Sequence, residues 1–275
     1  MHPRIDDSFC STFSDKHGVI VISLDYPKSP AAKFPLAVNA LTDLTIAILE
    51  DETLPVDLGK VAMGGCSAGG NLAVGVCQDE HLQGKIHGVV AFYPPVDFSV
   101  DKGDKFKLLK GLARERKQRG GSGEIGGKVL PEGHMWMFNW GYVDEGQDLQ
   151  DPRLSLFYAK RESLPANICV VGCELDVLCW ENEEFAEKLA GEYHGEYHGA
   201  SSSLVWEKNG VRWEKILDED HGEFSHIIIT QRGFVKVKPG FDNILAFGEK
   251  KARMAKRGQE MRDGVAEWLF RKVYV

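Results

Sequence analysis

The segment Gly64-Gly65-Cys66-Ser67-Ala68-Gly69-Gly70-Asn71 decides the fold class of this chain. It contains the pattern G-x-S-x-G with Ser67 at its centre. The run Lys60–Gly65 before the serine predicts a short strand, and the small-residue run Ala68–Gln78 after it predicts a helix. A strand–turn–helix unit is the context in which this pattern exposes a serine nucleophile. The turn is sharp and strained, so glycine is needed where a side chain would collide.

Other glycine motifs do not fit the same segment. The dinucleotide pattern G-x-G-x-x-G would need glycine at position 66 or 67, where the chain has Cys66 and Ser67. A phosphate-binding P-loop would need lysine at position 70 or 71, where it has Gly70 and Asn71. A structural glycine turn with an idle serine remains the alternative, and the strand–turn–helix context disfavours it.

Apolar runs along the chain alternate with helical patterns. Strands buried on both faces are predicted for Gly18–Asp25, Ile86–Tyr93 and Ile168–Gly172, because these runs lack polar alternation. Helices are predicted within Phe34–Glu50 and near Trp180–Ala190. This order predicts an α/β fold with a mostly parallel sheet flanked by helices.

A long insertion, residues 97–165, separates two of these strands. Its first half is basic, which is typical of a solvated segment. Its second half carries Trp136, Phe138 and Trp140. These rings could belong to an ordinary core or line an apolar ligand pocket. We expect the insertion to be a cap over Ser67, with these rings lining the substrate pocket.

A serine hydroxyl needs a base, and the base needs an orienting carboxylate. In this kind of fold the chain order is serine, acid, histidine. Glu174 and Asp176 both follow the strand Ile168–Gly172, where the acid belongs. His221 lies in a polar, turn-like stretch, and His226, its competitor, leads into an apolar run. We therefore expect His221 to be the base.

Length and charge narrow the class of protein. The chain has 275 residues, which suits a single α/β domain, 1–275, and a net charge of -8, which disfavours a nucleic-acid partner. No apolar run is long enough to span a membrane, and no secretory signal is visible. The six cysteines form no C-x-x-C pair, so buried reduced thiols and a cytoplasmic location are expected.

The duplicated stretch GEYHGEYHG, residues 191–199, places His194 and His198 four positions apart. They could face one metal ion if the stretch were helical. Its glycines favour a surface loop instead, and no metal or organic cofactor is expected.

Five motifs resemble the hormone-sensitive-lipase-like family of α/β-hydrolases, the fold-3 group. They are Asp25-Tyr26-Pro27 followed by Phe34-Pro35, Gly64 to Asn71, Asp151-Pro152-Arg153-Leu154-Ser155, Leu175-Asp176-Val177-Leu178, and His221-Gly222 with Phe224. The resemblance implies the α/β-hydrolase fold, a small-molecule ester substrate and no cofactor. It also places the acid on Asp176 rather than Glu174.

The chain departs from the family pattern in two places. The link from Asp176 to His221 is longer than usual. The family's H-G-G-G oxyanion loop is absent, since none of the His-Gly pairs at 17, 87, 194, 198 and 221 continues into further glycines. We expect the chain to begin after that loop. We also expect it to lack the family's third strand, which in the family's sheet lies between the strands that match Gly18–Asp25 and Lys60–Gly65.

These observations predict ester hydrolysis through an acyl-enzyme. Ser67 would attack, His221 would carry the proton, Asp176 would orient His221, and the backbone N–H of Ala68 would face the oxyanion. We expect this chain to hydrolyse esters poorly or not at all, because the missing loop would supply further donors to the oxyanion. A non-catalytic binding protein on the same fold, or a lyase or acyl-transfer enzyme, are the alternatives.

Overall fold

A computed structural model describes residues 7–118, 132–191, 197–198, 202–221 and 241–274. Its centre is a five-stranded sheet with the order β1-β2-β3-β5-β4. The strands are β1 (Ala62–Cys66), β2 (Gly88–Phe92), β3 (Asn167–Cys173), β4 (Ser203–Lys208) and β5 (Val211–Ile216). Strands β1, β2, β3 and β5 run parallel, and β4 pairs antiparallel with β5. The predicted α/β class with a mostly parallel sheet is confirmed.

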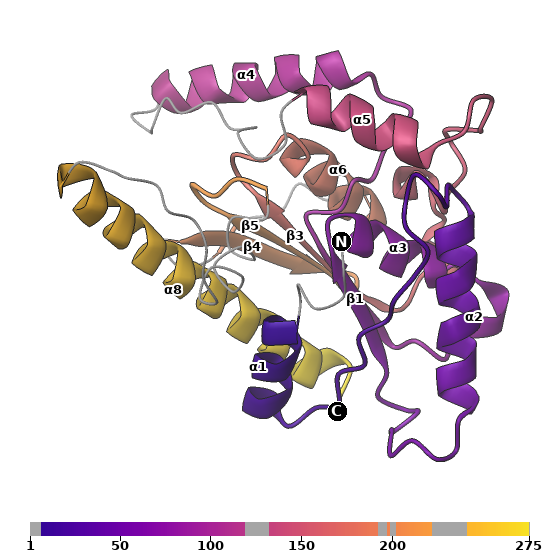
Figure 1. The fold of residues 1–275 in the computed structure, drawn as a ribbon. Coiled ribbons are helices and arrows are strands. Elements are labelled where there is room, and N and C mark those ends of the chain that lie inside the picture. Colours follow the sequence, from indigo (N-terminus) through magenta and orange to yellow (C-terminus); the bar gives the residue numbers. More distant parts are fainter. Residues whose placement is uncertain (1–6, 119–131, 192–196, 199–201, 222–240, 275) are drawn as a thin grey trace.

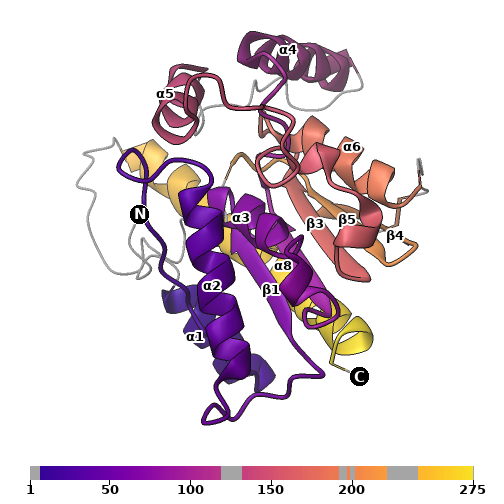
Figure 2. The same ribbon diagram turned by 90° about the vertical axis from the view of Figure 1, so that its right-hand side faces the viewer.

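Helices cover both faces of this sheet (Figures 1 and 2). The α-helices are α1 (Asp7–His17), α2 (Leu36–Glu50), α3 (Ala68–Val76), α4 (Lys102–Gln118), α5 (Glu132–Tyr142), α6 (Cys179–Leu189) and α8 (Phe241–Lys272). Short 3-10 turns occur at η2 (Glu80–Leu82), η3 (Leu156–Tyr158) and η4 (Arg161–Ser163). Helices α2, α3 and α6 pack on one face, and α1 and α8 pack on the other. Helices α4 and α5 lie together beyond the sheet, at the top of both views.

The buried strands explain why the sequence shows apolar runs without polar alternation. In β2, Val89 and Ala91 belong to the core under α2, α3 and α6. Their neighbours Val90 and Phe92 belong to the core under α1 and α8. Successive side chains of a strand point to opposite faces, so a sheet covered on both faces needs apolar residues at every position.

The segment Gly18–Asp25 corrects one prediction. Its apolar pattern predicts a buried strand, but the segment forms no strand in the structure, and Ile20 is 58% exposed. A strand requires a hydrogen-bonded neighbour, and in the described part of the chain β1 has such a neighbour only in β2. The apolar pattern identified a segment suited to a strand, but no described strand pairs with it.

A separate small core ties α4 and α5 to the loop after β3. It consists of Phe106 and Leu109 from α4, Met135 from α5, and Val177 and Leu178 from the loop after β3. The insertion 97–165 therefore packs against residues that directly follow Asp176.

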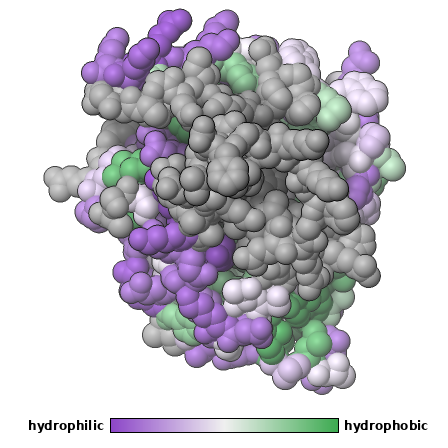
Figure 3. Space-filling view, turned by 60° about the vertical axis from the view of Figure 1, so that its left-hand side comes forward, coloured by the Kyte–Doolittle hydropathy of each residue, from purple (hydrophilic) through white to green (hydrophobic). Residues whose placement is uncertain are grey.

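In the space-filling view of Figure 3, hydrophilic residues run down one side of the coloured surface and hydrophobic residues gather at its lower right. Among the described helices, none combines the length and the apolar character needed to cross a membrane.

Replacement of a central isoleucine should test this layering. Ile168, in β3, is fully buried between β2 and β5. Ile168→Ala should lower the free energy of unfolding by about 2–5 kcal/mol, because it removes buried methyl groups and leaves a cavity. Ile20→Ala is the matched control, and should change it by no more than about 0.5 kcal/mol. Both values come from urea unfolding, and an equal loss in the two variants would contradict the exposed position of Ile20.

Candidate active site

Ser67 occupies the sharp turn between β1 and α3. Its φ of 52° and ψ of -120° are strained for a residue with a side chain. Its N–H donates to the carbonyl oxygen of Phe92 at 2.8 Å, and its carbonyl oxygen accepts the N–H groups of Gly70 at 2.9 Å and Asn71 at 3.1 Å. These backbone bonds hold the strained turn from both the neighbouring strand and the following helix.

Two glycines leave room for the turn: Gly65, which the pattern G-x-S-x-G names, and Gly70, which it does not. A Cβ on Gly65 would lie 2.4 Å from the carbonyl carbon of Gly69. A Cβ on Gly70 would lie 2.9 Å from the carbonyl oxygen of Gly65. A Cβ on Gly69 would meet nothing within 4 Å. The strand and the helix therefore approach each other through the backbones of Gly65, Gly69 and Gly70.

Ser67, His221 and Asp176 form one continuous chain of hydrogen bonds. The Oγ of Ser67 lies 2.9 Å from the Nε2 of His221, and the Nδ1 of His221 lies 2.7 Å from the Oδ2 of Asp176. The Asp176 side chain is fully buried and that of His221 is 8% exposed. If Nδ1 carries the proton that faces the carboxylate, Nε2 is left to accept the serine proton.

The loops that carry Asp176 and His221 are tied to each other. The N–H of Leu175 donates to the carbonyl oxygen of Glu219 at 2.8 Å, and the N–H of His221 donates to Oδ1 of Asp220 at 2.7 Å. The second oxygen of Asp176, Oδ1, accepts the N–H of Leu178 at 3.0 Å. Asp176 is therefore held by a backbone amide as well as by His221, and the backbone of His221 is held by the carboxylate of Asp220.

Glu174, the competing acid, makes a different contact. Glu174 accepts the N–H of Asp218 at 2.9 Å, so it braces the turn before His221 instead of contacting the imidazole. His226 lies outside the described residues. His194 does too, whereas the backbone of His198 pairs with Val205. The described residues contain no group of three potential metal ligands.

Ala68 is the first residue of α3. Its N–H is one of the amides at a helix N-terminus that have no acceptor within the helix, where a negative charge is favoured. The predicted pocket residues Trp136, Phe138 and Trp140 lie on α5, and each is more than half exposed. A small cavity beside α5 is instead lined by Met135 and Asn139 from that helix. A role for the three rings in binding a substrate stays a prediction.

Sequence patterns missed Tyr93, which directly follows β2. Its φ is 40°, its side chain is buried, and its ring meets the His221 ring edge-on with 4.8 Å between centroids. The two prolines after it mark the end of the strand, but nothing in the sequence connects Tyr93 with a histidine so far along the chain.

The buried thiols do not compete with Ser67. Burial raises the pKa of Cys77 and Cys169 to about 12, so both stay protonated near neutral pH and lack the thiolate that reacts. Burial likewise raises the pKa of Cys179, which begins α6. None of the described cysteines forms a disulfide.

A layered parallel sheet with a Ser-His-Asp hydrogen-bond chain at the carboxyl ends of its strands is the arrangement of α/β-hydrolases. A family model described as alpha/beta hydrolase fold matches residues 1–199. The chain therefore belongs to this family, in its hormone-sensitive-lipase-like, fold-3 group, as the sequence motifs predicted.

Curated relatives match parts of the chain. An AB hydrolase superfamily protein of Schizosaccharomyces pombe is 26% identical over 189 residues, which are 67% of this chain and 52% of that protein. Neutral cholesterol ester hydrolase 1 of Bos taurus is 32% identical over 98 residues, 33% of this chain and 24% of that protein. The chain thus matches about half of the first relative's length and a quarter of the second's.

Solved structures share the fold. An esterase of Pyrobaculum calidifontis superposes with a TM-score of 0.68 at 22% identity, over 96% of this chain and 69% of that one. At this identity the likeness concerns the fold alone.

The unequal roles of the glycines give a matched pair of variants. Gly65→Ala should prevent the turn from forming, because its Cβ would meet backbone that cannot move aside. Gly69→Ala should fold and should be slightly more stable than the natural chain, by about 0.5–1 kcal/mol, since alanine costs less than glycine inside a helix. Thermal unfolding followed by circular dichroism compares them. If Gly69→Ala were as unstable as Gly65→Ala, the pattern's second glycine would be needed for a reason other than space. If Gly65→Ala were as stable as Gly69→Ala, the collision assigned to position 65 would be wrong.

Proposed function

We propose that this chain is a serine hydrolase that cleaves carboxylic esters through an acyl-enzyme. The observation that carries the proposal is the hydrogen-bond chain from Ser67 Oγ through His221 to Asp176. Membership of the α/β-hydrolase family and the esterases among its relatives support a hydrolase. We also treat residues 1–275 as one domain whose insertion, 97–165, is the cap.

In the acylation step, Ser67 Oγ attacks the ester carbonyl carbon while Nε2 of His221 takes the hydroxyl proton. The carbonyl π electrons move onto oxygen, and the tetrahedral intermediate is negatively charged. Asp176 stabilises the imidazolium that forms. When the intermediate collapses, the C–O bond to the alcohol breaks, and His221 returns the proton to the leaving alkoxide.

Deacylation repeats these steps with water. His221 takes a proton from the water as it attacks the acyl-serine, and the Ser67 oxygen leaves with that proton. In both steps the N–H of Ala68 donates to the oxyanion, assisted by its position at the start of α3. The substrate that suits a site beneath a cap with aromatic residues is a small or medium apolar ester, with Trp136, Phe138 and Trp140 as candidate contacts.

A protein that binds an ester or an acid with little turnover is the second candidate. The observation that favours it is the lack of glycines after every His-Gly pair, which leaves Ala68 as the one oxyanion donor that we assign. Loss of one such donor typically costs about 10²–10³ in kcat. A slow but serine-dependent reaction is therefore the expected behaviour.

Neutralising the two carboxylates in turn should identify the acid. Asp176→Asn should lower kcat on p-nitrophenyl acetate by about 10⁴-fold, because an amide favours the wrong tautomer of the base. Glu174→Gln, its matched control two positions earlier, should leave kcat nearly unchanged, because the Glu174 carboxylate accepts the N–H of Asp218 and is not the group that bonds to the imidazole. An equal loss in both variants would reject the assignment.

A fluorophosphonate probe, which reacts only with activated serines, should label the natural chain and not Ser67→Ala. Mass spectrometry of the labelled peptide identifies the serine. Hydrolysis that persists unchanged in Ser67→Ala would exclude the proposed nucleophile, and a chain that neither labels nor hydrolyses would support the binding protein.

A further inference from the structure

The loop Tyr93–Asp97 leaves the sheet in the middle of the candidate site. It follows β2, which lies between the strand that ends before Ser67 and the strand that ends before Asp176. The N–H of Tyr93 donates to the carbonyl oxygen of Val171 at 2.6 Å. The Tyr93 ring contacts His221, so the position of this loop determines one wall around the imidazole.

Side chains from three helices hold the backbone of this loop. Asn71, in α3, donates to the carbonyl oxygen of Pro95 at 2.8 Å. Asn182, in α6, donates to that of Pro94 at 2.6 Å. The Oε1 of Glu181, also in α6, accepts the N–H of Val96 at 2.8 Å. Lys105, in α4, donates to the carbonyl oxygen of Asp97 at 2.5 Å.

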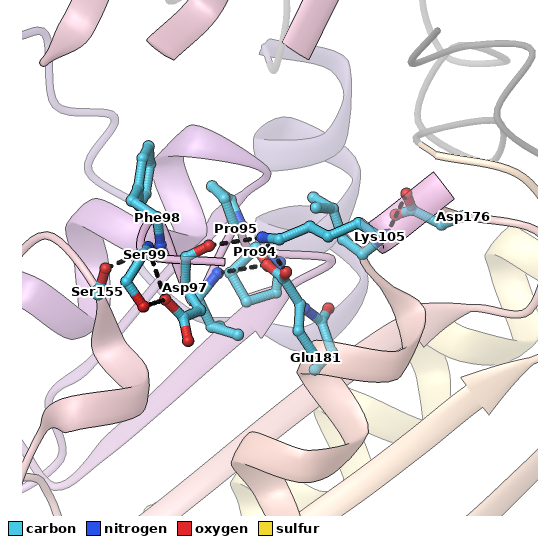
Figure 4. Close-up of polar contacts among 12 residues, drawn as sticks. Pro94, Pro95, Asp97, Phe98, Ser99, Lys105, Ser155, Asp176 and Glu181 are labelled. Carbon is cyan, nitrogen blue, oxygen red and sulfur yellow. Dashed lines mark hydrogen bonds and ion pairs between the residues drawn. The ribbon is translucent and has the colours of Figure 1, made fainter. Parts of the chain in front are cut away.

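Two of these side chains also form a buried ion pair. The Nζ of Lys105 contacts the Oε2 of Glu181, and the two side chains are only 5% and 4% exposed. Figure 4 shows the Lys105 side chain extending between Asp97 and Glu181. Burial raises the pKa of Glu181, whereas the charge of Lys105 and the hydrogen bonds from Lys105 and Val96 act in the opposite direction. Neither charge is favourable at this place without the other.

The pair links elements that belong to different parts of the molecule. Lys105 comes from the insertion, and Glu181 from the first turn of the helix that begins three residues after Asp176. Helix α4 also meets the loop before α6 through apolar contacts, since Phe106 and Leu109 pack with Val177 and Leu178. A displacement of α4 would therefore reach both the loop before α6 and the loop that carries Tyr93.

We propose that Lys105 and Glu181 are positioning residues that fix the Tyr93–Asp97 loop, and through the Tyr93 ring hold His221 in line with Ser67, so that the insertion is coupled to the catalytic base. The kinetic consequence rests on the proposed ester hydrolysis. The consequence for the geometry of His221 does not.

The experiment compares the natural chain with the double variant Lys105→Met/Glu181→Gln. Methionine keeps the length of lysine, glutamine keeps an acceptor for Val96, and no charge is left buried alone, so the variant should fold. Its kcat on p-nitrophenyl acetate should fall about 10- to 100-fold with little change in KM, because the base is misplaced while the substrate still binds. The single variant Lys105→Arg, in which Glu181 is unchanged, should keep most of the natural kcat, because arginine keeps the charge.

The matched control is Lys107→Met. Lys107 lies on the same helix and pairs with Asp104 at an exposed position, so its loss should leave kcat unchanged. A double variant that is folded and has the kcat of the natural chain would overturn the proposal. A loss in Lys107→Met as large as in the double variant would overturn it too, because any charge change on α4 would then suffice.

A second readout separates this inference from the proposed function. In chains labelled with ¹⁵N-histidine, the ring Nδ1–H resonance of His221 is assigned by its loss in His221→Gln. It should move in the double variant and stay in place in Lys107→Met. An unmoved resonance would overturn the positioning role even if the chain hydrolyses no ester, whereas inactivity of the natural chain would overturn only the proposed function.

If the double variant fails to fold, Tyr93→Leu tests the same link, since it removes the ring from His221 and leaves the ion pair in place. It should lower kcat and move the His221 resonance in the same way. A natural kcat and an unmoved resonance in Tyr93→Leu would overturn the proposal.

Discussion

The close approach of two glycine backbones, Gly65 and Gly69, is the constraint on which the site depends. It lets β1 turn directly into α3, and a side chain at position 65 would block it at 2.4 Å. The strained backbone of Ser67 follows from this approach, because the turn has no room for a relaxed one. The same turn places the N-terminus of α3 beside the serine, so one packing contact determines both the position of Ser67 and that of a nearby amide donor.

The parallel sheet then determines which groups can meet Ser67. Strands β1, β2 and β3 are neighbours, and their carboxyl ends lie at one edge. The residues just after them are Ser67, Tyr93 and the loop with Asp176. His221 follows β5, the next strand beyond β3. Groups far apart in the chain meet because parallel strands end together, which is why ligands of α/β proteins bind at this edge.

The sequence predicts the site better than its surroundings. Ser67, Asp176 and His221 could be named because each lies in a short pattern beside a strand or a turn, and the structure brings the three together. The apolar run Gly18–Asp25 predicts a strand that the structure does not contain. Such a run shows only that a segment is suited to a sheet, and a strand also requires a hydrogen-bonded partner strand. Lys105 and Glu181 were not foreseen: a lysine in a basic helix is normally solvated, and only the folded chain shows that this one is buried against a carboxylate.

This buried pair also shows how an inserted segment can be fixed accurately. Apolar contacts such as those of Phe106 and Leu109 hold α4 against the loop after β3, but they are non-directional and allow a helix to slide. Hydrogen bonds restrict both distance and angle. Lys105 bonds to the Asp97 carbonyl and Glu181 to the Val96 amide, so the charged pair holds the backbone of two adjacent residues of one loop. Because that loop begins with Tyr93, a directional contact in the insertion sets the environment of His221, which apolar packing alone would leave loosely defined.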